Sequence, residues 1–342
     1  MTSAYDAVLL VSFGGPEGPA DVLPFLENVL RGKNVPRERM LAVAEHYRHF
    51  GGVSPLNAQN RALVSALDAE LQARGPRLPV YWGNRNWHPL LADTLAQMTR
   101  DGVRRALGFF TSAYSSYSSC RQYREDIQRA CATLGAAAPQ VDKLRAYFNH
   151  PGFIGPMVER MREARSLVPE ERRAQARVVF TAHSIPLAMS ETSPYVAQLT
   201  EASRLVCESL GIVNQELAYQ SRSGPPQQAW LEPDILDVLR RLHGEGRTRD
   251  VVVVPIGFLS DHIEILWDLD TEAQQLAQQL GLNLIRASTV GSHPDFVGMI
   301  RELIAERVSD APRRSLGVLG PSHDACPADC CPPLLREPSS AS

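Results

Sequence analysis

Short, continuous apolar runs alternate with longer amphipathic segments along almost the whole chain of 342 residues. Continuous apolar runs are typical of parallel strands that helices cover on both faces. The expected strands lie at residues 7–13, 80–83, 105–110, 140–144, 177–182, 216–220, 250–257 and 283–286. Amphipathic helices are expected between them, among others at residues 55–73, 89–100, 120–132, 194–209 and 269–280. The alternation predicts an α/β protein with doubly wound parallel sheets.

The length of the chain predicts two domains at roughly 150 residues each. We expect two doubly wound halves, residues 1–147 and residues 148–292, that meet between residues 145 and 151. The segment 293–309 carries a last helical pattern, which we expect to return to the first half. From residue 310 to residue 342 the composition turns to Pro, Ser, Cys and Arg. This composition predicts a tail that is ordered by whatever its cysteines bind.

Charge and hydropathy argue against two classes of partner. The 35 basic and 38 acidic residues give a net charge of −3, so no nucleic acid partner is expected. The apolar runs are far shorter than the ~20 residues that a transmembrane helix needs. The N-terminus enters its first expected strand without a basic leader, and we therefore expect a cytoplasmic protein with no transmembrane segment.

Two ionisable residues fall at expected strand ends, where doubly wound folds bind their ligands. His183 follows the strand at residues 177–182, and Glu264 follows the strand at residues 250–257. An imidazole and a carboxylate bind a divalent metal loosely, accept protons, or do both in turn. Two ligands are too few for a tight structural site, so we expect a delivery site. A purely structural His183 remains the alternative.

An acidic stripe surrounds Glu264. Its carboxylates follow helical spacing at Asp261, Glu264, Asp268 and Glu272, on a helix expected to start with Ser260 or Asp261 as its N-cap. Four like charges on one face repel each other unless a cation or solvent relieves them. The stripe is therefore either a cation track or a solvated acidic face, and its apolar neighbours favour the track.

Hydroxyl and aromatic residues gather in further loops at strand ends. The segment 111–120 is rich in Ser and Tyr, and Tyr123 follows it. Together with Phe13, Trp87 and Trp230, these side chains could line a slot for a large planar ligand. Each aromatic taken alone is more often part of a hydrophobic core.

The cysteines are few and uneven, since Cys326, Cys330 and Cys331 are three of only six. In a chain without an export signal, clustered cysteines more often bind metal than form disulfides.

Several separated motifs resemble the ferrochelatases, which insert Fe²⁺ into a porphyrin, from Ala7 to Val308. In chain order they are Ser12-Phe13-Gly14-Gly15-Pro16, Phe50-Gly51-Gly52-Val53-Ser54-Pro55, Gly83-Asn84-Arg85-Asn86-Trp87-His88-Pro89, Thr181-Ala182-His183-Ser184-Ile185-Pro186, Gln220-Ser221-Arg222-Ser223-Gly224-Pro225 with Trp230-Leu231, and residues 257–270. The resemblance implies two Rossmann-like domains of the class II chelatase fold, with a porphyrin cleft between them.

The resemblance also implies roles for individual residues. His183 and Glu264 correspond to the catalytic metal-site pair of the family. The acidic helix of the family, which often contains a π-type distortion, corresponds to Asp261, His262, Asp268 and Glu272. Contacts to the porphyrin are expected from Ser54, Tyr123, Arg31, Tyr47, Phe13 and Trp230.

The expected substrate is coproporphyrin III, because residues 25–29, 42–47 and 84–87 are most similar to the bacterial branch that acts on it. Phe13 stands where that branch often has Tyr, which removes an axial oxygen ligand for the product iron. Three alternatives stay open: a protoporphyrin IX ferrochelatase, a non-catalytic porphyrin or haem carrier, and a chelatase for cobalt or nickel. Contacts with other haem-pathway enzymes are also expected.

Some ferrochelatases hold a [2Fe–2S] cluster with three cysteines near the C-terminus and one internal cysteine. The resemblance therefore implies a cluster on Cys120, Cys326, Cys330 and Cys331. Cys131 and Cys207 are alternatives for the internal ligand. Four thiolates also suit tetrahedral zinc, and an unliganded tail is the third possibility.

Overall fold

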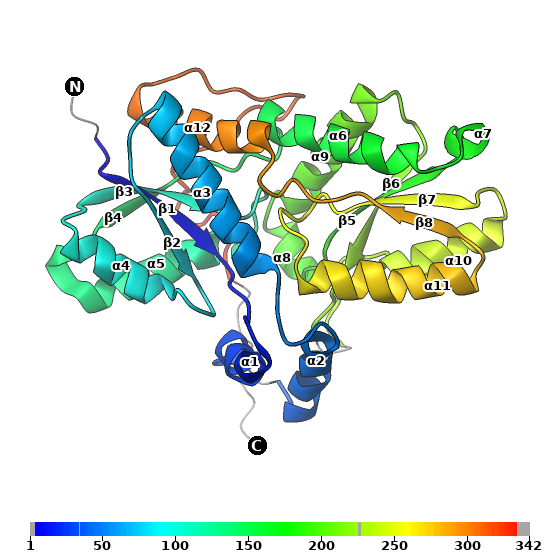
Figure 1. Cartoon of the computed structure of the whole chain (residues 1–342), viewed down its shortest axis with the longest axis horizontal. Helices are drawn as coiled ribbons and strands as arrows, with labels where there is room; N and C mark the ends of the chain where they lie inside the picture. The colour runs from blue at the N-terminus through cyan, green and yellow to red at the C-terminus, as the bar shows by residue number, and fades with distance from the viewer. Residues whose placement is uncertain (1–3, 34, 225–226, 334–342) are drawn as a thin grey trace.

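The structure is a computed structural model that describes residues 4–33, 35–224 and 227–333. Within these residues the chain forms two four-stranded parallel sheets that lie side by side (Figure 1). The first sheet has the order β2-β1-β3-β4, and the second has the order β6-β5-β7-β8. The strands are β1 (Ala7–Ser12), β2 (Val80–Asn84), β3 (Arg105–Phe110), β4 (Gln140–Lys143), β5 (Arg177–His183), β6 (Gln215–Gln220), β7 (Asp250–Val254) and β8 (Asn283–Arg286).

All the expected strands are confirmed, and most bounds differ by one residue. The largest difference is at β7, which ends at Val254 instead of residue 257. Pro255 follows directly, and proline has no N–H to donate to the strand ladder. Every residue of β1 and β7 is buried, which explains why their sequences are continuously apolar.

Helices cover both faces of the two sheets (Figure 1). The expected helices are present as α3 (Leu56–Arg74), α4 (Leu91–Arg100), α5 (Gln122–Leu134), α9 (Tyr195–Ser209), α11 (Gln274–Gln279) and α12 (Pro294–Val308). Further helices are α1 (Val22–Leu30), α2 (Arg37–His49), α6 (Pro151–Ser166), α7 (Glu170–Arg173), α8 (Leu187–Glu191) and α10 (Ile235–Glu245), with short 3₁₀ turns η1 (Pro19–Asp21) and η3 (Gly135–Ala137). Two segments are π-helical, η2 (Tyr117–Arg121) and η4 (Ile265–Ala273).

One hydrophobic cluster joins the two halves of the molecule. Phe109 and Tyr147 pack with Phe153 and Phe296, and the same cluster continues to Phe180 in the second sheet. Helix α12 contacts both α3 and α6, as Figure 1 also shows. The expected domain bounds stay predictions. They are residues 1–147 and 148–292 for the two halves, and residues 293–309 for the returning segment.

Helices α1 and α2 form an excursion beyond the carboxyl end of β1 (Figure 1). They have a small core of their own, built on Val22, Phe25, Leu26, Met40 and Ala44. The excursion contacts the second half, because the ring of His46 on α2 stacks on Trp267 of η4 with centroids 3.9 Å apart. It therefore bridges the strand ends at which the candidate site lies.

Candidate functional site

His183 and Glu264 meet at the strand ends. His183 is the last residue of β5, and Glu264 immediately precedes η4. The Nδ1 atom of His183 lies 2.5 Å from the carbonyl oxygen of Ser184, which leaves Nε2 facing Oε2 of Glu264 at 3.8 Å. The side chains are 34% and 43% exposed, so the pair is accessible to a ligand.

Buried tyrosines support the backbone around this pair. The hydroxyl of Tyr195, at the start of α9, donates to the carbonyl oxygen of His183 at 3.0 Å. The hydroxyl of Tyr114 donates to the carbonyl oxygen of Ile256, also at 3.0 Å, and so ties the first half to the loop before η4. Burial raises the pKa of both phenols, which therefore stay protonated donors at neutral pH. Sequence patterns alone did not reveal these supports.

Asp268 is the most perturbed carboxyl group near the pair. Ser221 and Gln220, at the end of β6, both donate to its Oδ2 atom, Gln220 at 3.2 Å. Burial is the largest cause that raises the pKa of Asp268 to about 7, and the nearby charges of Glu264 and Glu272 raise it further. Asp268 therefore exchanges its proton near neutral pH, beside the exposed Glu264.

Asp261 departs from the expected acidic stripe. Helical structure starts only at Ile263, so the expectation that Ser260 or Asp261 caps this helix is wrong. Asp261 lies before the helix, and its Oδ1 atom accepts from Nη1 of Arg286 at 2.8 Å. Arg286 also binds Asp270. The expected single helical face is thus wrong for Asp261, because the helix begins after it and its carboxylate pairs with Arg286 instead.

His262 takes the capping position instead. Its Nδ1 atom accepts the backbone N–H of Glu264 at 3.2 Å, and its ring packs edge-on against Phe258. Burial lowers the pKa of His262, which favours the neutral ring that this acceptor role needs. In this structure His262 therefore orients the backbone at Glu264.

The excursion places aromatic side chains on the same side as the pair. Phe25 contacts the rings of Phe13, Tyr47 and Trp87 edge-on. Phe13 is 37% exposed and is available to a planar ligand. Burial, and next the charge of Glu264, raise the pKa of Tyr47, so its hydroxyl stays protonated at neutral pH.

Two of the other four expected porphyrin contacts are buried. Ser54 is 4% exposed, and its Oγ atom accepts the N–H of Leu56 at 3.4 Å. Tyr123 is 5% exposed and lies beneath the guanidinium of Arg85. Arg31 is exposed and donates to Asn28. Trp230 packs against Gly224, in the loop after β6. Ser54 and Tyr123 thus offer little exposed surface to a ligand in this structure.

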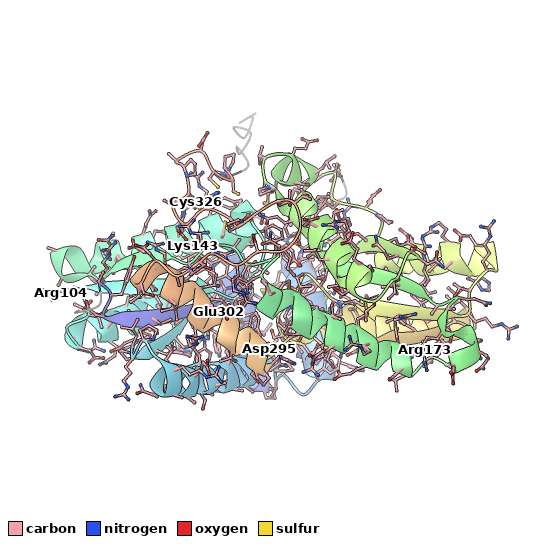
Figure 2. All side chains as sticks on the ribbon, turned by 90° about the horizontal axis from the view of Figure 1, so that it is seen from above. Arg104, Lys143, Arg173, Asp295, Glu302 and Cys326 are labelled. Atoms are coloured by element: carbon pink, nitrogen blue, oxygen red, sulfur yellow. The ribbon has the colours of Figure 1, made fainter. Side chains whose placement is uncertain are left out.

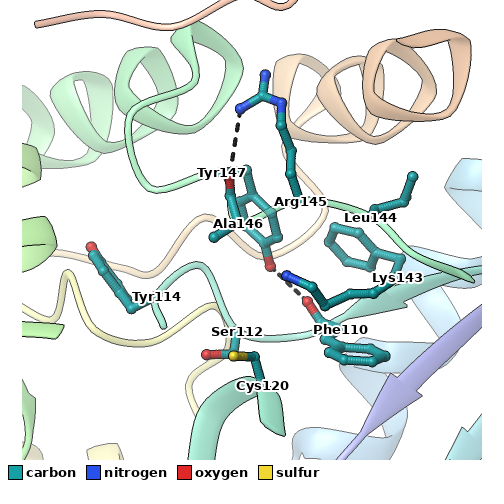
Figure 3. Close-up of a pocket in the computed structure, with 10 residues that line it drawn as sticks. Phe110, Ser112, Tyr114, Cys120, Lys143, Leu144, Arg145, Ala146 and Tyr147 are labelled. Carbon is teal, nitrogen blue, oxygen red and sulfur yellow. Dashed lines mark hydrogen bonds between the residues drawn. The ribbon is translucent and has the colours of Figure 1, made fainter. Parts of the chain in front are cut away.

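A small internal cavity lies between the end of β3 and the segment after β4 (Figure 3). Cys120, Lys143 and Tyr147 contribute to its lining, and the hydroxyl of Tyr147 donates to the carbonyl oxygen of Phe110. Its volume is about 10 Å³, the space of about one water molecule. It is too small for a porphyrin. Its lining includes Cys120, one of the expected cluster ligands.

The structure brings the four expected cluster cysteines together. Cys120 comes from η2 and lies in one buried cluster with Cys331, whose Sγ atom lies 3.7 Å from that of Cys330. Cys326 joins them, near Lys143 at the end of β4 (Figure 2). The alternatives Cys131 and Cys207 lie elsewhere: Cys131 contacts the carbonyl oxygen of Pro139, and Cys207 is buried in the main core.

Cations surround these thiols. The neighbouring thiol of Cys331, and then the charges of Lys143 and Arg124, lower the pKa of Cys120 to about 6. Arg121 holds the tail by donating to the carbonyl oxygens of Ala328 and Cys330 at 3.1 and 3.0 Å. Nearby positive charge fits an anionic metal–thiolate centre.

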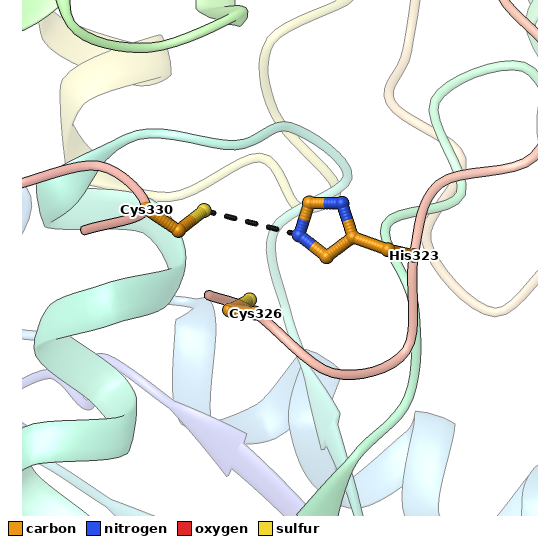
Figure 4. Close-up of side chains that lie close together, drawn as sticks. All are labelled: His323, Cys326 and Cys330. Carbon is orange, nitrogen blue, oxygen red and sulfur yellow. Dashed lines mark hydrogen bonds between the residues drawn. The ribbon is translucent and has the colours of Figure 1, made fainter. Parts of the chain in front are cut away.

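His323 provides one further potential metal ligand at this place, which the sequence motifs did not indicate. The Nε2 atom of His323 lies 3.8 Å from Sγ of Cys330, and one donor atom each from His323, Cys326 and Cys330 lie within 4.8 Å of one another (Figure 4). The short spacing from His323 to Cys326 is typical of metal ligands and was the signal that could have found it. Separately, none of the helices in the described residues is long and apolar enough to span a bilayer.

Two parallel sheets, with an imidazole–carboxylate pair beyond the strand ends of the second one, define a protein with the class II chelatase fold. SirB from Bacillus subtilis, solved with Fe³⁺, has this architecture: it aligns with a TM-score of 0.55 and 14% identity, over 89% of this chain and 96% of its own. At this identity the likeness shows the fold alone.

Sequence similarity is more specific. The family model described as Ferrochelatase matches residues 5–308, so the chain belongs to the ferrochelatase family. It is 55% identical to a ferrochelatase of Rhodopirellula baltica, over 98% of this chain and 96% of the relative. It is 53% identical to a coproporphyrin III ferrochelatase of Frankia alni, over 99% of this chain and 89% of the relative. A coproporphyrin III ferrochelatase of Nocardia farcinica is 50% identical over 99% of both chains.

Proposed function

We propose that this protein inserts Fe²⁺ into coproporphyrin III and so makes Fe-coproporphyrin in haem biosynthesis. The observation that carries the proposal is the His183–Glu264 pair, with 3.8 Å between Nε2, at the end of β5, and Oε2, at the start of η4. The names of similar proteins from Frankia alni and Nocardia farcinica support coproporphyrin III as the substrate. We place the reaction in the cytoplasm, and contacts with other haem-pathway enzymes stay a prediction.

Insertion of a divalent metal releases the two N–H protons of a free porphyrin, so the site must accept protons as well as iron. His183 directs Nδ1 to a carbonyl oxygen and keeps Nε2 for the substrate. In the proposed reaction, Nε2 accepts the pyrrole protons with the help of Glu264. A cleft that bends the macrocycle would expose its nitrogens.

The carboxylates of η4 support a path for protons and hydrated iron. Asp268, whose pKa is raised to about 7, takes up and releases a proton near neutral pH behind Glu264. Glu272 lies further along the same helix. These oxygens also suit a hydrated divalent cation. Asp261 and His262 have structural partners, so we give them a positioning role around Glu264.

We propose that the porphyrin binds between two parts of the structure. One is the excursion formed by α1 and α2, and the other is the His183–Glu264 pair. Phe13 and Tyr47 contribute to the slot, with Trp230 on the other half and Arg31 as a cation for a propionate group. Ser54 and Tyr123 are buried, so their contacts to propionate groups require a local movement. The absence of an oxygen at Phe13 leaves the product iron without a ligand from that position.

We further propose that Cys120, Cys326, Cys330 and Cys331 hold a [2Fe–2S] cluster, with tetrahedral zinc as the alternative. The converging thiols and the positive charge of Lys143 and Arg124 support the cluster. When bound, such a cluster would supply one-electron redox chemistry, and here it would serve a structural or sensory role. The residues themselves attach the tail to η2.

The proposed function is tested by anaerobic assays with Fe²⁺ and either coproporphyrin III or protoporphyrin IX, followed by porphyrin absorbance. Insertion into coproporphyrin III is the expected result. A preference for protoporphyrin IX would overturn the substrate. Binding of both porphyrins without insertion would instead indicate a carrier.

A further inference from the structure

The cysteine site contains one donor more than a four-ligand centre needs. We use the name tail site for Cys120, Cys326, Cys330, Cys331 and His323. The imidazole ring of His323 points at Cys330, with 3.8 Å between Nε2 and Sγ (Figure 4). Four thiols already supply the ligands of a [2Fe–2S] cluster, so the imidazole has no vacant position on iron to fill.

The position of His323 is held from both sides. The next residue, Asp324, pairs with Arg313, and its Oδ1 atom lies 3.9 Å from Nη1 of Arg307 on α12. After Cys326, Arg121 anchors the carbonyl oxygens of Ala328 and Cys330 to η2. Contacts to Arg313, α12 and η2 thus hold both arms of the loop between His323 and Cys330, which keeps the ring beside one particular sulfur.

Cys120 is a better fourth ligand than His323. It is buried in the main fold in one cluster with Cys331, and it lies beside the cations Lys143 and Arg124. His323 is exposed and contacts Cys330 from the solvent side. A ring at this place is suited to donate a hydrogen bond to a sulfur atom that already binds iron.

We propose that His323 is a positioning residue that donates its Nε2–H to Sγ of Cys330 and thereby raises the reduction potential of the cluster. The inference rests on the proposed cluster. Reduction adds a negative charge that spreads over the cysteine sulfurs. A donor at a sulfur stabilises the reduced state more than the oxidised state, and hydrogen bonds to sulfur are known determinants of cluster potential.

The test compares His323→Phe, which keeps a ring but removes the donor, with His323→Gln, which restores an N–H donor. His243→Phe, at an exposed position of α10, is the matched control. Each full-length protein is purified anaerobically. Iron, acid-labile sulfide, the visible spectrum and the midpoint potential are then measured. We expect full cluster content in all variants, a more negative potential in His323→Phe, and a return toward wild type in His323→Gln.

Equal potentials in wild type and His323→Phe would overturn the inference. Loss of the cluster from His323→Phe, or a directly bound nitrogen in pulsed EPR of the reduced wild type, would also overturn it by making His323 a ligand. Wild-type protein without iron and sulfide would refute the proposed cluster itself, which is distinguishable because no visible spectrum would appear.

Discussion

The imidazole of His183 and the carboxylate of Glu264 face each other across the ends of two strands of the second sheet, with 3.8 Å between Nε2 and Oε2. The backbone of each residue has its own support. Tyr195 donates to the carbonyl oxygen of His183, and the N–H of Glu264 donates to His262. The pair is therefore positioned before any substrate arrives, while its side chains stay accessible.

His183→Ala should reduce iron insertion by at least about a hundredfold, because general base catalysis contributes on the order of 10²–10⁴ in rate. Binding of coproporphyrin III, followed by fluorescence titration, should change little, since the cleft surface stays in place. His243→Ala, at an exposed position, is the control. Near-normal turnover in His183→Ala would refute its role as the proton acceptor.

Asp268→Asn should gain stability over wild type as pH rises, in protein free of added metal. The folded carboxyl group titrates near 7 instead of its usual 3.8, so its contribution is fully present below pH 3.8 and is lost as pH rises through 7. At about 1.4 kcal/mol for each pKa unit, the loss is on the order of 4 kcal/mol. Asparagine cannot ionise and keeps the acceptor oxygen for Ser221 and Gln220.

The measurement for this variant is the urea unfolding free energy at about pH 5 and about pH 8. The difference between Asp268→Asn and wild type should grow between the two pH values. Asp237→Asn, with a side chain that is 67% exposed, should show no such growth. A constant difference for Asp268→Asn would show that Asp268 is already ionised at about pH 5.

Single substitutions in the Arg145–Glu306 ion pair should strongly destabilise the fold. The guanidinium and carboxylate form two hydrogen bonds of 2.7 and 2.8 Å, and the side chains are 1% and 2% exposed. Removing one partner of a buried pair leaves an uncompensated charge and costs about 3–5 kcal/mol. Urea unfolding of Glu306→Met and Arg145→Met should show this loss.

The double variant Arg145→Met with Glu306→Met should recover most of the stability, because neither charge is then buried alone. Full recovery is not expected, since Arg145 also donates to the carbonyl oxygen of Arg314. The exposed pair of Arg240 and Asp237 provides the comparison, and Asp237→Asn should cost less than about 1 kcal/mol. Additive losses in the double variant would contradict this account.

Cys120→Ala should lose iron and sulfide, whereas Cys207→Ala and Cys131→Ala should keep both. The reason is position: Cys120 packs in one cluster with Cys331, while Cys207 lies in the main core and Cys131 contacts Pro139. Metal analysis of anaerobically purified protein makes the comparison. Limited proteolysis should also cut the tail more readily in Cys120→Ala. Retention of the cluster in Cys120→Ala would assign the fourth ligand elsewhere.

The sheets were predictable because strand formation leaves a local pattern in the chain. Continuous apolar runs located every strand. Only for β7 was the expected range more than one residue too long, because hydropathy does not register that Pro255 lacks an N–H. The position of His183 followed from the same pattern, because the residue after a parallel strand lies at its ligand-binding edge.

Contacts between distant segments were not predictable in this way. The spacing of the acidic stripe did not reveal that Arg286, on β8, would neutralise Asp261. It also did not reveal the burial that holds a proton on Asp268. Hydropathy did not indicate the excursion formed by α1 and α2, although the family motifs implied that Arg31 and Tyr47 contact the porphyrin.

The amino-acid sequence by itself determined the α/β architecture, the strand-end location of His183 and Glu264, and the candidate cysteines. Only the tertiary structure decided that Cys120 joins the tail and that His323 lies beside Cys330. Periodicity and motif spacing depend on neighbouring residues along one chain segment. Burial, charge and hydrogen bonding at a site depend on segments that meet only after folding.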